Sequence, residues 1–299
     1  PYRRPPMQPV VQVEEVAGAP TRRRFLELPH VLDGGDPRFA PLVLAWERFR
    51  VDRHRNPALA GADWALLVAR RGGTPVGRIS VRIDDGSEEG TFGHWWVDDD
   101  PAVADAVLDA ATAWLAERGA RSITGPITMG PDQEQGVQVE GHDVPGVTGR
   151  PWHPPRLASA LAARGFEVAG ARPTWRLAVP PLDASVTPRP PERRAPTGLP
   201  DPAGPYADPR LTVPGGRAVP DVAPTLRTSR WRGALEAARR ARAGTWDTAV
   251  VVGPLDEPER TVPTLLAAAA AAGYRELITP WSPDDGAPEA VHATFTRPC

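Results

Sequence analysis

The fold is decided by residues 90–119, which read GTFGHWWVDDDPAVADAVLDAATAWLAERG. The first eight residues alternate as a buried β-strand does, and they predict two faces: Phe92, His94 and Trp96 on one, Trp95 and Val97 on the other. The pair Asp100–Pro101 predicts a helix start, because the carboxylate accepts hydrogen bonds from free N–H groups and Pro fits the first turn. Apolar residues then recur at helical spacing up to Gly119, the predicted helix end. We therefore expect a strand, an acidic turn and a helix that packs back on the strand.

The composition argues against several classes of protein. The chain has 299 residues and a net charge of −2, so the total charge gives no reason to expect nucleic acid as a partner. Every basic residue other than His is Arg, and Ala, Gly and Pro are abundant, which is typical of a high-GC genome such as an actinobacterial one. The single cysteine, Cys299, allows no intrachain disulfide and no cysteine zinc site, and it fits a cytoplasmic location. No apolar run is long enough to predict a membrane span.

The remaining sequence divides into three parts. Residues 1–180 predict an α/β domain that includes a helix over 42–51, with Leu44, Trp46 and Phe49 as its buried residues, and a hairpin around Gly72-Gly73. Residues 181–220 are rich in Pro, Gly, Asp and Arg and predict a linker or extended arm. Residues 221–299 predict a smaller α/β unit. Within the first part, residues 125–155 form a long irregular stretch of the kind that is usually functional or mobile.

The order of these elements and several motifs resemble the GNAT acyltransferases, and more specifically an uncharacterised bacterial GNAT-like family. The residues that carry the resemblance are FLELPHVL (25–32), DPRFAPL (36–42), NPAL (56–59), VARRGGTPVGRI (68–79), TFGHWW (91–96), DDDP (98–101), GPITM (125–129), VEGHD (139–143) and ARGFE (163–167). The resemblance implies a mixed α/β sheet flanked by helices, with the C-terminal unit as a second, reduced GNAT half. It also implies acyl transfer, with acetyl-CoA as the cofactor.

The chain departs from the family pattern where the cofactor would bind. GNAT enzymes hold acetyl-CoA on backbone N–H groups of an Arg/Gln-x-x-Gly-x-Gly/Ala turn, which here reads VDDDPA (97–102). Three carboxylates would repel a pyrophosphate. In the C-terminal unit the corresponding stretch, LDEPERTV (255–262), also lacks the glycines. The sequence therefore does not decide which cofactor binds. The resemblance implies acetyl-CoA, but the motif that would bind it is degenerate.

The candidate site residues have functional and structural interpretations. As catalytic residues we name His94, Asp98, Asp99 and Asp100; the histidine is a general base or a core residue, and the aspartates are bases, amine ligands or helix caps. As substrate-binding residues we name Trp95, Trp96, Glu134, His142, Asp143, Trp152 and His153, which either line a cleft or fill a core and a solvated loop. His142, Asp143 and His153 have no diagnostic metal-binding spacing, so we expect no metal.

Three functions follow. The first is an enzyme of specialised, natural-product metabolism that acylates a small amine or amino-acid-derived substrate. The second is an acid–base catalyst that does not use CoA and performs elimination or cyclisation, motivated by His94 and the acidic turn. The third is a non-catalytic subunit of a heteromeric complex that contacts a protein partner through the Pro-rich arm. None of the three requires nucleic acid or a membrane.

Overall fold

The computed structural model describes residues 10–41, 43–130, 135–181, 209–227, 246–252, 255–284 and 286–299, together with the helical positions Glu236 and Arg240. In its N-terminal part the elements are β1 (Val11–Glu15), α1 (Gly18–Asp33), α2 (Leu44–Arg50), η1 (Pro57–Leu59), β2 (Ala62–Arg71), β3 (Thr74–Asp84), β4 (Glu89–Val97), α3 (Pro101–Ala116), β5 (Ser122–Gly125), β6 (Val137–Glu140), α4 (Pro155–Ala163) and β7 (Glu167–Ala178). The C-terminal part comprises η3 (Pro209–Leu211), β8 (Thr212–Val213), β9 (Gly216–Pro220), α5 (Ala223–Arg227), β10 (Thr248–Val252), α7 (Pro258–Ala271), β11 (Glu276–Thr279) and β12 (Ala290–Pro298).

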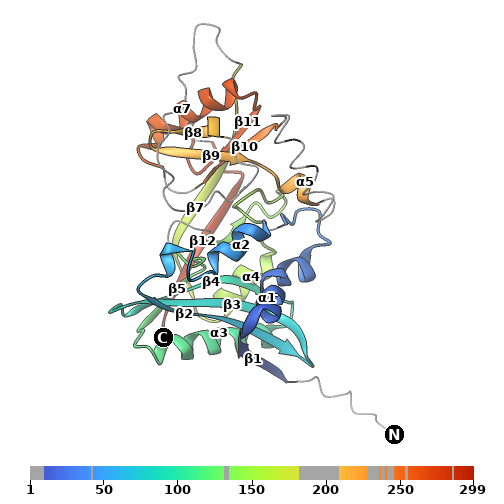
Figure 1. Ribbon diagram of the computed structural model, residues 1–299, viewed down its shortest axis with the longest axis vertical. Helices are drawn as coiled ribbons and strands as arrows, with labels where there is room; N and C mark the ends of the chain where they lie inside the picture. The colour runs from blue at the N-terminus through green and yellow to red at the C-terminus, as the bar shows by residue number, and fades with distance from the viewer. Residues whose placement is uncertain are drawn as a thin grey trace.

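Both parts contribute to one sheet, and they exchange strands at its centre. The strand order is β1-β2-β3-β4-β5-β12-β7-β11-β10-β9-β8, with β6 paired to β12 off this path. The C-terminal strand β12 pairs with β5 of the N-terminal part, while β7 pairs with β11 of the C-terminal part. Figure 1 shows β7 and β12 side by side in the middle of the molecule, where they join its upper and lower parts, with the chain end next to β5. The predicted mixed α/β sheet flanked by helices is confirmed.

The arrangement repeats across the pair β12–β7. On one side β4 and β5 are parallel with α3 between them in the chain, and on the other side β10 and β11 are parallel with α7 between them. Each side then accepts the last strand of the other. The predicted second, reduced half is therefore present as a sheet and a helix. Where the two halves meet, the sheet of each half is completed by a strand from the other half.

The segment predicted as an arm contains regular structure near its C-terminal end. Residues 182–208 lie outside the described residues, but 209–220 contain η3, β8 and β9, and β9 pairs with β10. The last residues of the predicted arm, 209–220, thus contribute strands to the sheet of the C-terminal part. Short strands such as β8, with two residues, give little periodicity for a sequence pattern to detect.

The predicted strand–turn–helix unit is present, with α3 starting at Pro101. Asp100 accepts a hydrogen bond from the backbone N–H of Ala102 at 2.9 Å, as a helix-capping carboxylate does. The buried face of α3 consists of Val103, Ala104, Val107, Leu108, Ala111 and Leu115. Gly119 follows with φ 90°, a left-handed conformation that a glycine adopts without strain.

The predicted faces of β4 are partly wrong, because the strand contains a bulge. Ser80 pairs with Gly93 and Arg78 pairs with Trp96, so β4 has one residue more than β3 across this interval. His94 has φ 47° at the bulge. Phe92 consequently packs on Phe166, with ring centroids 5.6 Å apart, whereas the His94 ring contacts Phe25 of α1 at 5.5 Å. A bulge reverses the alternation beyond it, so Phe92 and His94 do not share a face.

Candidate active site

His94 lies in a buried polar cluster between the sheet and the helices α1 and α2. Its Nδ1 is 2.9 Å from the Ser80 hydroxyl oxygen on β3, within hydrogen-bonding distance. Among the described residues its Nε2 has no hydrogen-bond partner, and it lies 3.7 Å from the Glu47 carboxylate on α2. His94, Ser80 and Glu47 are 5%, 2% and 2% exposed. Within the described part of the chain an imidazole nitrogen is thus buried without a hydrogen bond, and buried polar atoms of this kind are uncommon.

The environment keeps His94 neutral. Burial holds its pKa well below the ordinary value, and the positive charges of Arg78 and Arg50 lower the pKa further. A neutral imidazole has a lone pair on one ring nitrogen and can therefore accept a proton. Its positive φ also suggests a functional role, because strained backbone conformations occur disproportionately at such sites.

Two buried arginines surround this histidine. Arg50 and Glu47 form an ion pair at 2.7 Å, and the Arg50 guanidinium lies 3.7 Å from the centroid of the Trp46 ring. Arg78 donates from Nη1 to the backbone carbonyls of Phe25 and Leu26 in α1, at 2.9 and 3.2 Å. Buried ion pairs are weak evidence for stability, since desolvation offsets much of their attraction. The cluster is better explained as a site that holds charge and hydrogen bonds in fixed positions.

The residues around His94 are not among those predicted from the sequence. Of the residues predicted to be buried in this helix, Leu44, Trp46 and Phe49, only Phe49 is buried, and Glu47 and Arg50 take the inner positions. The available signal was a charged residue at a core-facing position, such as Arg78 between Gly77 and Ile79 in an apolar strand. Such residues are rarely buried unless they are paired.

The three aspartates of the acidic turn have partners of their own. Arg71 on β2 lies 2.5 Å from Asp100 and 3.8 Å from Asp98. Arg156 contacts Asp99 at 3.3 Å. Burial raises the pKa of Asp98, partly opposed by the backbone N–H of Asp100 and by Arg71. The structure therefore places these carboxylates as a helix cap and in ion pairs, and within the described residues none of them contacts His94.

The start of α3 does not fit the pyrophosphate of a coenzyme A. The N–H of Asp98 donates to the Val76 carbonyl, that of Asp100 donates to the Asp98 carboxylate, and that of Ala102 donates to the Asp100 carboxylate. An anion site at a helix start needs free N–H groups and a favourable charge. Here the protein uses these donors itself and adds three carboxylates.

The groove between β4 and β5 is closed by the chain that follows β5. The two strands pair only from Glu89 to Thr91, and beyond this point Ile127 donates its N–H to the Phe92 carbonyl at 2.6 Å. Gly93 permits this approach, since a Cβ there would collide with the Ile127 carbonyl. On the other side of the sheet centre, Arg150 reaches the Val251 carbonyl of β10 at 3.5 Å. The stretch 125–155 thus contacts a backbone carbonyl of β4 in the first half and a backbone carbonyl of β10 in the second half.

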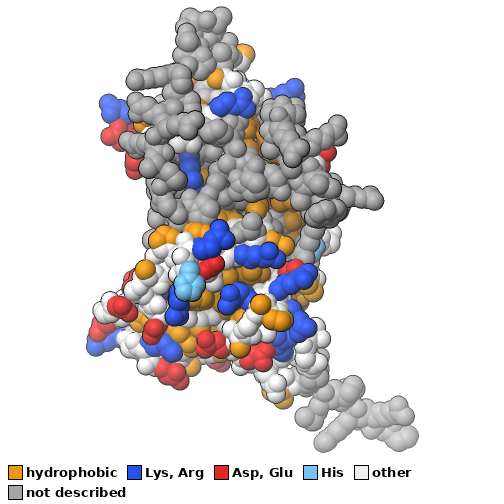
Figure 2. Space-filling model, in the orientation of Figure 1, with side chains coloured by type: hydrophobic (Ala, Val, Ile, Leu, Met, Phe, Trp, Pro, Cys, Tyr) orange, Lys and Arg blue, Asp and Glu red, His pale blue; other side chains and the backbone are white. Residues whose placement is uncertain are grey.

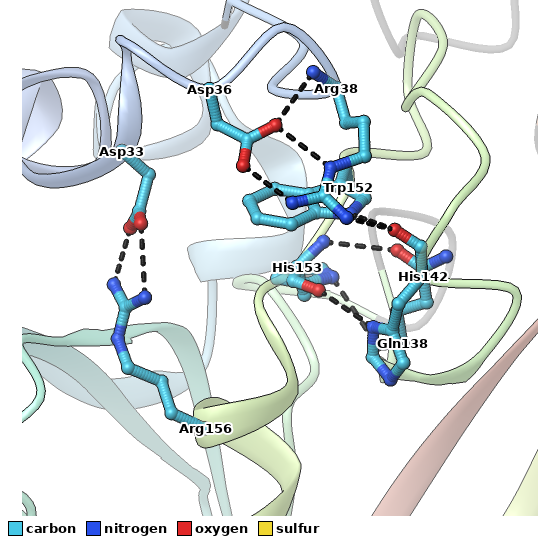
Figure 3. A network of polar contacts seen from close by, with 8 residues as sticks. All are labelled: Asp33, Asp36, Arg38, Gln138, His142, Trp152, His153 and Arg156. Atoms are coloured by element: carbon cyan, nitrogen blue, oxygen red, sulfur yellow. Dashed lines mark hydrogen bonds and ion pairs between the residues drawn. The ribbon is translucent and has the colours of Figure 1, made fainter.

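A second polar network joins several predicted substrate-binding residues (Figure 3). The His142 carbonyl accepts hydrogen bonds from Trp152 Nε1 at 2.8 Å and from Arg38 at 3.0 Å. The backbone N–H of His153 donates to the Gln138 side chain at 3.1 Å, and the His153 carbonyl lies 3.0 Å from Nδ1 of His142. Burial lowers the pKa of His153 to about 3, with further contributions from His142 and Arg78. The network fixes the long stretch 125–155 against the N-terminal part of the chain.

The remaining predicted residues lie at the edge of these clusters or outside them. Trp96 donates to the Asp33 carboxylate, which also pairs with Arg156, at 2.6 Å and packs against the His153 ring at 5.2 Å, so it links this ion pair to the second network. Trp95 donates to the Leu157 carbonyl of α4 on the opposite face. Asp143 is exposed. Glu134 lies outside the described residues.

Two cavities lie away from His94. One of about 20 Å³ is lined by residues of both halves, among them Gln138, Arg150 and His292. The other, of about 400 Å³, lies at the start of α7 and is lined by Pro214, Gly215, Asp256, Glu257, Arg260, Thr261 and Thr264. Acidic residues again stand at a helix start in the second half. Over the described part of the chain, no group of three His, Cys, Asp or Glu side chains is arranged to hold a metal ion. The helices in the same part are too short or too polar to cross a membrane.

Comparison with known proteins places the fold. A tandem GNAT protein from the clavulanic acid biosynthesis pathway aligns over 96% of this chain and 98% of its own, with a TM-score of 0.53 and 16% identity. In sequence, the chain is 32% identical over 156 residues to Protein YghO of Escherichia coli K12, and 35% identical over 130 residues to a bacterial ceramide synthase of Caulobacter vibrioides. These alignments span 40% and 34% of the two relatives and 49% and 41% of this chain. No family model matches the chain. The chain thus has the fold of a tandem GNAT protein, in which two halves share one sheet and exchange strands at its centre.

Proposed function

We propose that the chain forms an amide by moving an acyl group from a thioester to a small amine or an amino-acid-derived amine. The observation that carries this proposal is the Nε2 of the neutral, buried His94, which has no hydrogen-bond partner among the described residues and lies at the bulge in β4. Amide formation needs a base at this point, because the attacking amine must lose a proton.

In this reaction the chain supplies the groups that take up and return the proton. The amine nitrogen attacks the thioester carbonyl, a C–N bond forms, the C–S bond breaks, and the sulfur leaves as a thiol. His94 Nε2 takes the proton that the amine loses and returns it to the departing sulfur. Ser80 is a positioning residue, because its hydroxyl fixes the other ring nitrogen at 2.9 Å. Glu47, 3.7 Å away, stabilises the imidazolium formed during the step.

The name of one relative agrees with the class of bond proposed here. The Caulobacter vibrioides relative is named a ceramide synthase, and a ceramide is an amide of a long-chain amino alcohol. For the present chain only the class of bond, an amide from an amine and an acyl donor, enters the proposal.

The test is amide synthesis with an acyl thioester of N-acetylcysteamine and a panel of amines, followed by thiol release. We expect His94→Gln to lower kcat by about 100-fold or more, in the range by which general bases accelerate reactions. His54→Gln is the matched control, since it changes an exposed imidazole. A His94→Gln protein that folds normally and retains full kcat would contradict the proposal.

The second candidate is an acid–base catalyst that does not use a thioester. The acidic turn favours it, since three carboxylates occupy the position of the cofactor cradle. It predicts that Asp99→Asn and His94→Ala abolish turnover of an amine substrate without any acyl donor. Acyl transfer predicts that Asp99→Asn has little effect, because the Asp99 side chain is 91% exposed and contacts Arg156 rather than His94.

The third candidate, a non-catalytic subunit, depends on the Pro-rich arm. Its residues 182–208 lie outside the described part of the chain, so the partner role stays a prediction. It predicts that deletion of residues 186–205 breaks an association while His94→Ala has no effect. Co-purification of the full-length and deleted chains distinguishes the two results.

A further inference from the structure

The helices that cover His94 carry a set of exposed arginines. We call Arg22, Arg24, Arg48, Arg53 and Arg55 the arginine face; all five are exposed, on α1, on α2 and in the connection to η1. Figure 2 shows basic side chains gathered over these elements in the middle of the molecule. The chain as a whole has a net charge of −2, so this face is a local concentration of positive charge.

The five arginines differ from several other exposed arginines of the molecule in having no carboxylate partner. Among the described residues, none of the five lies within ion-pair distance of a carboxylate, whereas Arg121 pairs with Glu88, Arg260 with Glu257 and Arg275 with Asp247. Unpaired guanidinium groups on one face create a positive potential that steers acidic partners towards it.

Two of the guanidinium groups are held by aromatic rings. Arg53 lies 5.8 Å from the centroid of the Trp64 ring, and Arg55 lies 5.9 Å from that of Phe49. Stacking on a ring restricts a guanidinium and leaves its N–H groups available, which suits recognition of carboxylates in a defined geometry.

The arginine face adjoins the His94 cluster directly. Arg24 precedes Phe25, whose ring packs on His94, and Arg48 follows Glu47, which faces His94 Nε2. Both segments thus place a buried residue at the base and an exposed arginine at the surface above it. A partner bound here would lie over the helices that separate His94 from solvent.

We propose that the arginine face docks an acidic carrier protein, which presents its acyl group as a thioester on a phosphopantetheine arm. The proposal rests on the proposed acyl transfer and names its donor. The start of α3 has three carboxylates and no free N–H cradle, so it disfavours a donor with a nucleotide diphosphate. A carrier-bound thioester has no such group, and its recognition depends on protein surface charge. The thiol released is then that of the carrier.

An anionic membrane surface is the competing occupant. Binding to a membrane usually combines basic with exposed apolar side chains. In the described residues, the large apolar side chains that are strongly exposed are Val10, Val31 and Val168, and of these only Val31 lies on α1, while none lies on α2 or η1. Charge without apolar anchors favours the acidic protein.

The experiment compares two triple variants of the full chain that change the charge equally. R48E/R53E/R55E reverses the arginine face, and R121E/R260E/R275E reverses three exposed arginines outside it. Binding of an octanoyl-loaded bacterial acyl carrier protein is measured by calorimetry at low and high salt. We expect the first variant to bind about tenfold more weakly or worse, and the second to bind as the unchanged protein does. Salt should weaken binding of the unchanged protein.

The other outcomes overturn the proposal. If both variants bind the carrier equally, or the unchanged protein does not bind it, the arginine face is not a carrier site. Binding of phosphatidylglycerol vesicles that the first variant loses, without carrier binding, would assign the face to a membrane. Turnover of the N-acetylcysteamine thioester by the unchanged protein tests the proposed function separately, because this donor has neither a carrier nor a nucleotide.

Discussion

The buried imidazoles of His153 and His292 make stability depend on pH at the level of single residues. Their ring centroids are 5.7 Å apart, and burial lowers the pKa of each to about 3, helped in His292 by its neighbour His153. In the unfolded chain each ring binds a proton below about pH 6.5, while the folded protein does not. The free energy of unfolding therefore has its full value, as far as these two histidines are concerned, above about pH 6.5, and it falls as the pH drops towards 3. We expect a loss of roughly 2 kcal/mol per histidine at pH 5.

Urea denaturation at pH 7 and pH 5 measures this loss. His292→Gln should reduce the difference between the two pH values, because glutamine can still donate to the Pro151 carbonyl but cannot be protonated. Replacement of the exposed His54 by Gln is the control. Equal pH dependence in the unchanged protein and in His292→Gln would show that this imidazole is not responsible.

The start of the helix α3 depends on one carboxylate. Asp100 caps the helix through Ala102 and also pairs with Arg71, while the neighbouring Asp99 is nearly fully exposed. We expect Asp100→Ala to lower the free energy of unfolding by about 1 kcal/mol, the usual contribution of an N-cap. Asp99→Ala should change it little. If the two variants are equally stable in chemical denaturation, Asp100 does not act as the cap.

The sequence predicts elements well where the signals are local. The start of α3 at Pro101, its end near Gly119 and the hairpin of β2 and β3 all follow from residues adjacent in the chain. The bulge at His94 does not follow, because an alternating sequence contains no mark of the extra residue that tertiary contacts accommodate. Glu47, Arg50 and Ser80 were missed for the same reason, since their role depends on segments that meet only in the fold.

On the scale of the whole molecule, the exchange of β7 and β12 makes the two halves depend on each other. Phe295 of β12 is 4% exposed and belongs to the core of the N-terminal part, although it lies near the chain end. We expect Phe295→Ala to lower the free energy of unfolding by roughly 3 kcal/mol or more. Because both halves share the sheet centre, unfolding followed at residues of either half should shift together. A transition that shifts in one half alone would contradict the shared core.

The position of β12 also bears on synthesis of the chain. The space between β5 and β7 is filled by residues 290–298, which leave the ribosome after every other described strand. The N-terminal part would therefore emerge with two strand edges exposed, at Ser122–Gly125 and along Glu167–Thr174. Contacts between residues so distant in sequence slow folding and prolong exposure of such edges. A nascent chain paused before residue 290 would thus be the form most in need of a chaperone.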